Sequence, residues 1–123
     1  MKGLSRIVMI PGLMILAGLL SASCIRVDQA PGLSVMVIDV NDNPVQGAMV
    51  ALFDNQTEWH YLDNPAQVWR VTGISGEVLF TDLEEKSYYV YARKGSDDNR
   101  GDEMLTSGSL MSNQVMKVSI RIR

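Results

Sequence analysis

The side chains with the greatest chemical reactivity are scarce in this sequence of 123 residues. His60 is its single histidine and Cys24 is its single cysteine. A Ser-His-Asp hydrolase would have to use His60, but no nucleophile-elbow sequence accompanies it. Glu84 and Glu85 are adjacent, so in an extended chain they point to opposite sides and form a poor acid/base pair. We therefore expect no catalytic residue, no cofactor and no enzymatic activity.

Oxygen-bearing side chains concentrate in one short segment, residues 97–103. Its members are Asp97, Asp98, Asn99, Asp102 and Glu103. Calcium takes ligands of this type, but their spacing departs from the EF-hand pattern and Gly101 is misplaced for that loop. We interpret the segment as a solvated acidic loop and expect no metal site, with calcium binding by this loop left open.

Side chains that carry flat rings are the best indication of a binding surface. Such rings bind the apolar faces of sugars and are enriched at protein interfaces. In the alternative interpretation, the two tryptophans pack a long loop back onto the fold as a satellite cluster. The candidate ligand-binding residues are Trp59, His60, Tyr61, Trp69, Tyr89 and Tyr91.

The N-terminal segment is organised like a secretory signal peptide. Lys2 and Arg6 form a basic beginning, and an apolar run of 14 residues follows over 7–20, with Pro11 and Gly12 interrupting it. A membrane-spanning helix needs about 20 apolar residues, so this run is too short and too broken to span. We expect residues 1–23 to be a signal peptide.

Cys24 follows this segment directly and cannot form an intramolecular disulfide. Ala22-Ser23-Cys24 resembles the lipobox of bacterial lipoproteins, in which the cysteine is acylated and becomes the mature N-terminus; Ser21 stands where that family prefers Leu, Val or Ile. The resemblance implies a lipid anchor on Cys24, a tether over 24–32, and retention at the outer membrane because Ile25 replaces an aspartate. Several acyl chains on one residue anchor a protein stably.

The charge of the predicted mature chain limits the class of partner. Removing Lys2 and Arg6 from the 11 basic residues leaves 9 against 14 acidic residues, a net charge of −5. This balance argues against nucleic acid as a partner.

The rest of the chain, residues 33–123, shows short apolar segments separated by turn residues, a pattern typical of an all-β domain. No helical period is evident after Cys24. We expect a small antiparallel β-sandwich of about seven strands. The expected strands cover 33–40, 48–53, 67–71, 78–80, 88–92 and 114–123, with a 13-residue connection over 54–66 and a polar segment over 94–113 that includes a short strand near 104–106.

Four motifs carry a family resemblance: Val37-x-Asp39, Asn43-Pro44-Val45-x-Gly47-Ala48-x-Val50-x-Leu52, Thr72-x-x-x-Gly76-x-Val78-x-Phe80-x-x-Leu83 and Tyr88-x-Val90-x-Ala92. Together they resemble carboxypeptidase-regulatory-like domains, which have a transthyretin-like sandwich and occur in lipoproteins of Bacteroidota-type bacteria. The resemblance covers about 60 residues of the domain and implies a register. Tyr89 and Tyr91 then lie on the outer face, and the inward residues are Val35, Val37, Ala48, Val50, Leu52, Val78, Phe80, Leu83, Tyr88 and Val90.

A fold of this kind does not determine a function. We expect a non-enzymatic lipoprotein whose sandwich binds a protein partner or a glycan at the outer membrane, facing either the periplasm or the surface. The alternative is a structural, fimbrial or scaffold subunit that assembles by pairing an edge strand with a neighbour.

Overall fold

The computed structural model describes residues 28–101 and 106–123. The predicted signal peptide, Cys24 and the first part of the tether lie outside the described residues. Their assignment therefore stays a prediction.

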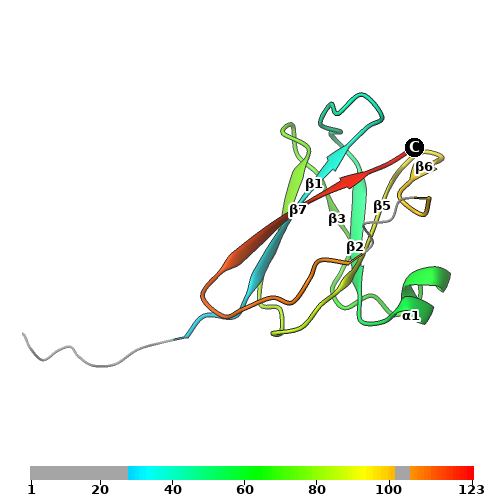
Figure 1. Ribbon diagram of the computed structural model, residues 1–123. Coiled ribbons are helices and arrows are strands. Elements are labelled where there is room, and N and C mark those ends of the chain that lie inside the picture. The colour runs from blue at the N-terminus through cyan, green and yellow to red at the C-terminus, as the bar shows by residue number, and fades with distance from the viewer. Residues whose placement is uncertain (1–27, 102–105) are drawn as a thin grey trace, which may run out of the picture.

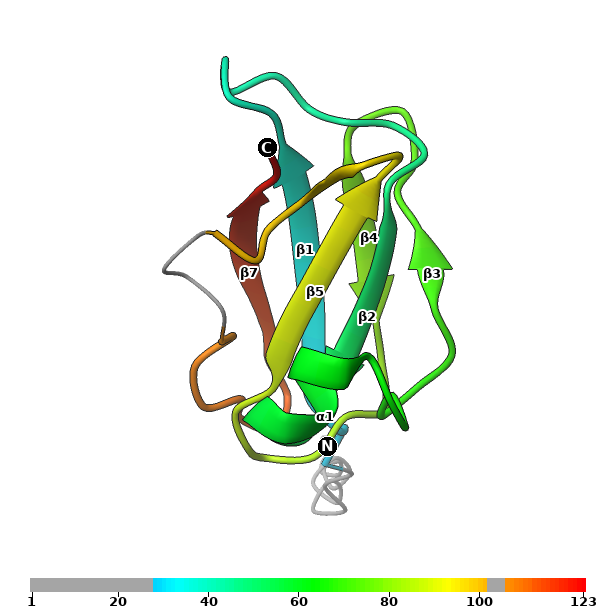
Figure 2. The same cartoon turned by 90° about the vertical axis from the view of Figure 1, so that its right-hand side faces the viewer.

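In the described part of the chain, seven strands and one short helix form a two-layered sandwich (Figures 1 and 2). A three-stranded sheet has the order β4-β1-β7, and a four-stranded sheet has the order β3-β2-β5-β6. This architecture confirms the predicted small β-sandwich. The elements are β1 Gly32–Ile38, β2 Met49–Phe53, α1 Gln56–Tyr61, β3 Arg70–Val71, β4 Glu77–Phe80, β5 Tyr89–Lys94, β6 Asp97–Asp98 and β7 Val115–Arg121.

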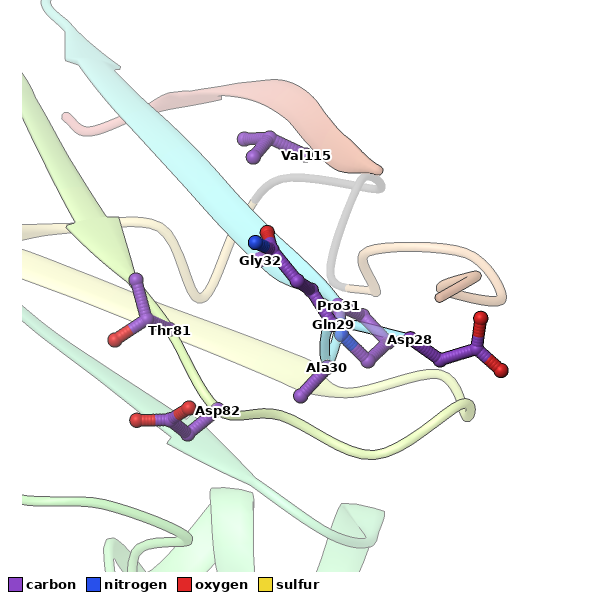
Figure 3. Close-up of a pocket in the computed structure, with 8 residues that line it drawn as sticks. All are labelled: Asp28, Gln29, Ala30, Pro31, Gly32, Thr81, Asp82 and Val115. Atoms are coloured by element: carbon purple, nitrogen blue, oxygen red, sulfur yellow. The ribbon is translucent and has the colours of Figure 1, made fainter. Parts of the chain in front are cut away.

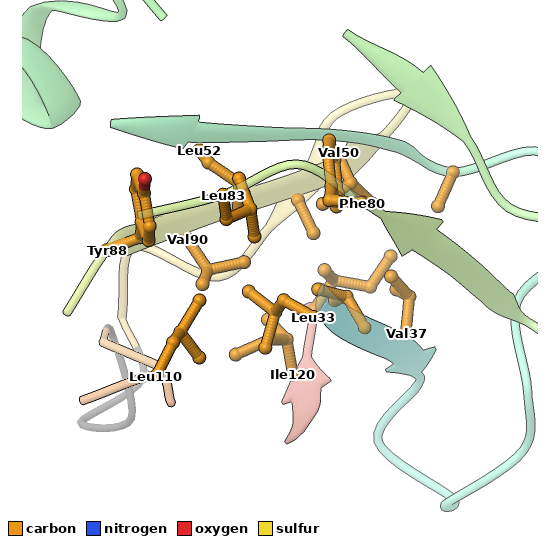
Figure 4. Close-up of a cluster of buried hydrophobic side chains, with 14 residues drawn as sticks. Leu33, Val37, Val50, Leu52, Phe80, Leu83, Tyr88, Val90, Leu110 and Ile120 are labelled. Atoms are coloured by element: carbon orange, nitrogen blue, oxygen red, sulfur yellow. The ribbon is translucent and has the colours of Figure 1, made fainter. Parts of the chain in front are cut away.

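Apolar side chains from both sheets meet between the layers (Figure 4). The alternation of a strand sends every second residue to the same face, so the core residues recur with a period of two. The predicted register is confirmed: nine of the ten inward residues are buried, and Val78 is partly buried against them. The fully buried members include Leu33, Val35, Val37, Val50, Leu52, Phe80, Val90 and Ile120.

One strand pair departs from the expected antiparallel arrangement. β1 and β7 are parallel neighbours over seven residue pairs, from Gly32↔Val115 to Ile38↔Arg121. Parallel neighbours need a long connection, and here most of the domain separates the two strands. As a result the described chain enters at one end of the sandwich and reaches Arg123 at the other (Figure 1).

The predicted connection over 54–66 contains a helix that the sequence did not reveal. Asn55 caps α1, because its Oδ1 accepts a hydrogen bond from the Glu58 N–H at 2.9 Å, and Leu62 ends it in the left-handed conformation. The expectation of no helix was therefore wrong, since six residues are too few to show a helical period.

The strand expected over 67–71 is shorter in the structure, Arg70–Val71. The polar segment 94–113 contains a hairpin strand, β6, that was not expected. Of the strand predicted near 104–106, only Thr106 is described, and it forms an isolated bridge with Tyr89.

Candidate functional site

The outer face of the four-stranded sheet carries most of the predicted ligand-binding residues. They belong to a second buried group, which we call the aromatic cluster: Ala51, Phe53, Trp59 and Tyr91, with Leu62, Trp69 and Tyr89 packed against them. The short helix α1 lies over this face (Figure 2). Tyr89 and Tyr91 are thus on the outer side of the sheet, but the chain itself covers them.

Trp59 is the residue that fixes α1 to the sheet. Its side chain is 5% exposed, and its Nε1–H donates a hydrogen bond to the backbone oxygen of Val90 at 2.9 Å. The ring also lies 6.4 Å from that of Tyr89 in a tilted arrangement. A buried indole with a satisfied N–H is a packing element.

Trp69 extends the cluster toward the sheet edge. Its ring meets Phe53 at 6.4 Å and Tyr91 at 5.9 Å, both in T-shaped arrangements that suit the quadrupoles of aromatic rings. The Arg93 guanidinium lies 5.8 Å from the centre of the Trp69 ring. Trp69 is only partly buried, so one side of it remains accessible.

Arg100 closes the other side of the cluster. Its guanidinium lies 5.2 Å from the Tyr91 ring centre, and Nη2 donates to the backbone oxygen of His60 at 3.0 Å. The Tyr91 hydroxyl donates to Asp98 Oδ2 at 3.0 Å. Burial, followed by this hydrogen bond to a carboxylate, raises the pKa of Tyr91 above its ordinary value.

His60 and Tyr61 are the exposed members of the predicted set. Tyr61 is 72% exposed, and the two rings meet edge to face at 4.8 Å. Together with Gln56 and Thr57 they line a shallow hollow on the outside of α1. Trp59 and Trp69 therefore pack against the fold as a satellite cluster, as the alternative interpretation of the sequence expects. Ligand binding by the six candidate residues stays a prediction.

The acidic segment contains a residue with an unexpected role. Asn99 is 1% exposed, its Oδ1 accepts from the Ala92 N–H at 3.0 Å, and its Nδ2 donates to the Val90 oxygen at 2.9 Å. Asn99 is therefore a buried clamp on β5 and not a solvated loop residue. Within residues 28–101 and 106–123, no group of three or more His, Cys, Asp or Glu side chains could hold a metal ion.

A second hollow lies where the described chain enters the sandwich, and the residues that line it come from the entry segment, from the chain just after β4 and from the start of β7 (Figure 3). Asn113 holds that segment: its N–H donates to the Gln29 oxygen at 2.9 Å, and its Oδ1 accepts from the Gln29 N–H at 2.8 Å. The lining residues are Asp28, Gln29, Ala30, Pro31, Gly32, Thr81, Asp82 and Val115. This hollow is formed by the attachment of the entry segment to the domain.

The sequence did not indicate which sheet edge would be open. The edge strands are β4 and β7 in one sheet and β3 and β6 in the other, and β7, with seven residues, is the longest. β3 and β6 have two residues each. A long edge strand presents unpaired backbone groups that another strand can bind.

The hydrogen bonds at the two ends of the β1–β7 ladder show which residues of β7 bond to β1 and which point to the free edge. Gly32 N–H donates to the Gln114 oxygen at 3.0 Å, and Ile122 N–H donates to the Ile38 oxygen at 2.9 Å. Because the bonds of a parallel ladder recur every two residues, the even-numbered residues of β7 face β1. The backbone groups of the odd-numbered residues point to the free edge, and among the described residues no backbone group pairs with those of Val115, Lys117, Ser119 and Arg121.

The side chains near this edge are a mixture of apolar and basic groups. Val115, the first residue of β7, is 54% exposed. Lys117 is exposed, whereas Arg121 is half-buried and forms an ion pair with Asp42 at 2.6 Å. The edge therefore offers main-chain hydrogen bonds beside positive charge.

No helix in the described part of the chain has the length and apolar character needed to cross a bilayer.

Solved structures of two pilus proteins are similar to this chain. A D312A variant of BcpA, the major pilin subunit of Bacillus cereus, superposes with a TM-score of 0.50 at 16% identity, over 77% of this chain and 30% of the pilin. The pilus 2b backbone protein of group B streptococcus superposes with a TM-score of 0.50 at 18% identity, over 76% of this chain and 40% of that protein. This chain therefore spans less than half the length of either protein. No protein-family model matches the sequence, and no curated protein matches it significantly. At this identity the similarity establishes the fold alone: the chain forms a small β-sandwich like those in two pilus proteins.

Proposed function

We propose that the protein is a non-enzymatic structural subunit of a cell-surface assembly, and that a neighbouring subunit adds an extended segment to the free edge of β7. The observation that carries this proposal is the hydrogen-bond pattern between β7 and β1, which leaves the N–H and C=O groups of the odd-numbered β7 residues pointing away from the fold. Strand addition to an open sheet edge is a common mode of protein association. The occurrence of similar sandwiches in two pilus proteins supports a structural role.

The charges along β7 indicate what the neighbour's segment looks like. Lys117 and Arg121 point to the same face of the sheet as Val115 and Ser119. If two copies of β7 paired with each other, their basic side chains would share one face, and like charges directly opposite each other are destabilising. The edge therefore suits an extended segment with acidic residues at alternate positions, and contacts between unlike surfaces build open chains of subunits.

A lipid anchor on Cys24 belongs to the same proposal. The described chain enters at the end of the sandwich where Asn113 holds Gln29, and about five residues separate Cys24 from that point. Five extended residues span at most about 18 Å, so an acylated Cys24 would keep this end close to the outer membrane. The opposite end, with Arg123, would then face away from the membrane.

Two substitutions at one exposed position test the pairing. Lys117→Pro removes an N–H that points to the free edge and leaves the β1 ladder bonds in place, a position where an edge strand tolerates proline. Lys117→Gln removes the charge and keeps the N–H. Cross-linking in intact cells followed by electrophoresis should show a ladder of oligomers in the wild type and Lys117→Gln, and its loss in Lys117→Pro.

Circular dichroism and thermal unfolding establish that both variants are folded, and Ser119→Pro repeats the test at a second outward-facing residue. A clean monomer in wild-type cells would contradict the proposal. So would an oligomer ladder that persists in both folded proline variants.

The second candidate function is a binding module for a glycan or a protein. The observation that favours it is the exposed pair of rings, His60 and Tyr61, which line a shallow hollow on the outside of α1. Glycan binding predicts a change in tryptophan fluorescence on titration with a glycan panel, reduced by Tyr61→Ala. Flat titrations across a broad panel would count against this candidate.

A further inference from the structure

The parallel pairing of β1 and β7 sets the direction in which the domain can carry force. The segment before β1 emerges at one end of the sandwich and the segment after β7 at the other (Figure 1). A pull between these two points acts along the strands and tries to slide β1 past β7. All hydrogen bonds of the ladder then resist together, whereas a pull that separates two adjacent strand ends breaks them one after another.

We propose that the β1–β7 ladder is the part of the domain that resists tension applied between the entry segment and the far end of β7. Force on an assembled subunit would pass from the neighbour's segment into β7, across the ladder into β1, and on to the membrane anchor. This role in the cell rests on the proposed function. The mechanical property belongs to the domain itself and can be measured without a partner.

Fixed contacts reinforce both ends of the ladder. At the entry end, Asn113 exchanges two hydrogen bonds with Gln29, next to the bond from Gly32 to Gln114. At the far end, Arg121 forms an ion pair with Asp42.

The far end is also tied to the other parts of the fold. Arg121 Nη1 donates to the backbone oxygen of Asp39 at 2.8 Å. Arg123 and Asp98 exchange two backbone hydrogen bonds, of 3.0 and 3.3 Å, so the chain after β7 is bound to the four-stranded sheet. Sliding of β7 therefore requires the loss of contacts at both ends of the ladder at the same time.

The buried side chains along the ladder oppose the same motion. Leu33, Val35 and Val37 from β1 are fully buried, and Ile120 from β7 and Ile122 beyond it are 1% and 3% exposed. Interiors are packed like crystals, so a slip along the strand drives each of these side chains into its neighbours. Forced unfolding reports the unfolding barrier, and this interlock raises that barrier in the sliding direction.

Single-molecule pulling in two geometries tests the proposal on one ladder. In the full chain, produced without acylation and kept in detergent, Cys24 supplies one thiol handle. The second handle is Arg123→Cys in the first geometry, which slides the strands. In the second geometry it is Met111→Cys, an exposed site shortly before β7, which peels the strands apart from the entry end. At equal pulling speed we expect the mean unfolding force to be about twofold or more higher in the first geometry.

Two substitutions on β7 show whether a change in unfolding force comes from the ladder or from the overall stability of the domain. Arg121→Gln removes the contacts at the far end of the ladder, and Lys117→Gln is the matched control on the same strand. Arg121→Gln should lower the force in the sliding geometry and leave the peeling force unchanged, because peeling reaches the far end last. Lys117→Gln should change neither. Equal forces in the two geometries would overturn the proposal, as would an equal loss in both geometries for Arg121→Gln. The proline variants test only the pairing of β7 with a neighbouring subunit, and the pulling experiments test only the resistance of the domain to force. The failure of one proposal can therefore be distinguished from the failure of the other.

Discussion

The two sheets present different surfaces to solvent. The outer face of the four-stranded sheet is covered by α1 and by aromatic rings from its own chain, and Tyr91 there is only 3% exposed. The three-stranded sheet ends in β7, whose outward backbone groups have no strand partner among the described residues. Rings that are occupied in packing stabilise the fold, whereas an open edge offers hydrogen bonds to another molecule. The aromatic cluster therefore stabilises the fold, and the β7 edge is the site at which we propose association.

The largest expected effect on stability is in the aromatic cluster. Trp59→Ala removes a buried ring and leaves the Val90 oxygen without one of its donors, so the free energy of unfolding should fall by about 3–5 kcal/mol. Tyr61→Ala, on the exposed side of the same helix, should stay within about 0.5 kcal/mol of the wild type. Urea denaturation measures both. If the two variants were equally stable, the covered face would not be a packing element.

A smaller loss is expected for the clamp on β5. Asn99→Ala deprives the Ala92 N–H of its buried partner, which should lower the free energy of unfolding by about 1–3 kcal/mol. The neighbouring Asp97→Ala is the matched control, because Asp97 is exposed and its side chain should contribute little. Denaturation of both variants would show whether the acidic segment is anchored to the sheet or is a free loop.

The smallest effect is a pH dependence that originates in the cluster. The pKa of Tyr91 is raised above its ordinary value of 10.0, mainly by burial and then by the Asp98 carboxylate. The folded protein therefore keeps this proton at a pH where the unfolded chain loses it. The contribution of Tyr91 to the free energy of unfolding is therefore complete below pH 10. It disappears as the pH rises through the pKa that Tyr91 has in the folded protein.

Denaturation from neutral pH into the alkaline range checks this effect. Tyr91→Phe should remove the part of the alkaline decline that Tyr91 causes, while Tyr61→Phe should retain it. Identical slopes in the two variants would mean that Tyr91 is not shielded from water.

Residue alternation grouped the residues of each strand that share a face, and the family resemblance supplied the register that turned one of those faces inward. Val35, Val50 and Phe80 were assigned in this way and are buried. A register gives the face of a residue and not what covers that face, so it placed Tyr91 on the outer side without revealing its burial.

Other features depend on tertiary contacts that a local pattern does not contain. The role of Asn99 was missed because its acidic neighbours made the whole segment look solvated. The parallel pairing of β1 with β7 was missed because strand neighbours at opposite ends of the chain are selected by the whole fold. The open edge that we propose as the association site follows from that pairing, so it could not be predicted from the sequence alone.

Hydrogen exchange along β7 tests the association site most directly. In the isolated protein the amides of Lys117 and Ser119 point to the free edge and should exchange quickly, while those of Met116 and Val118 are bonded to β1 and should be protected. In the assembled state on the cell envelope all four amides should be protected. Lys117 and Ser119 amides that exchange as quickly in the assembly as in the isolated protein would contradict strand pairing at this edge.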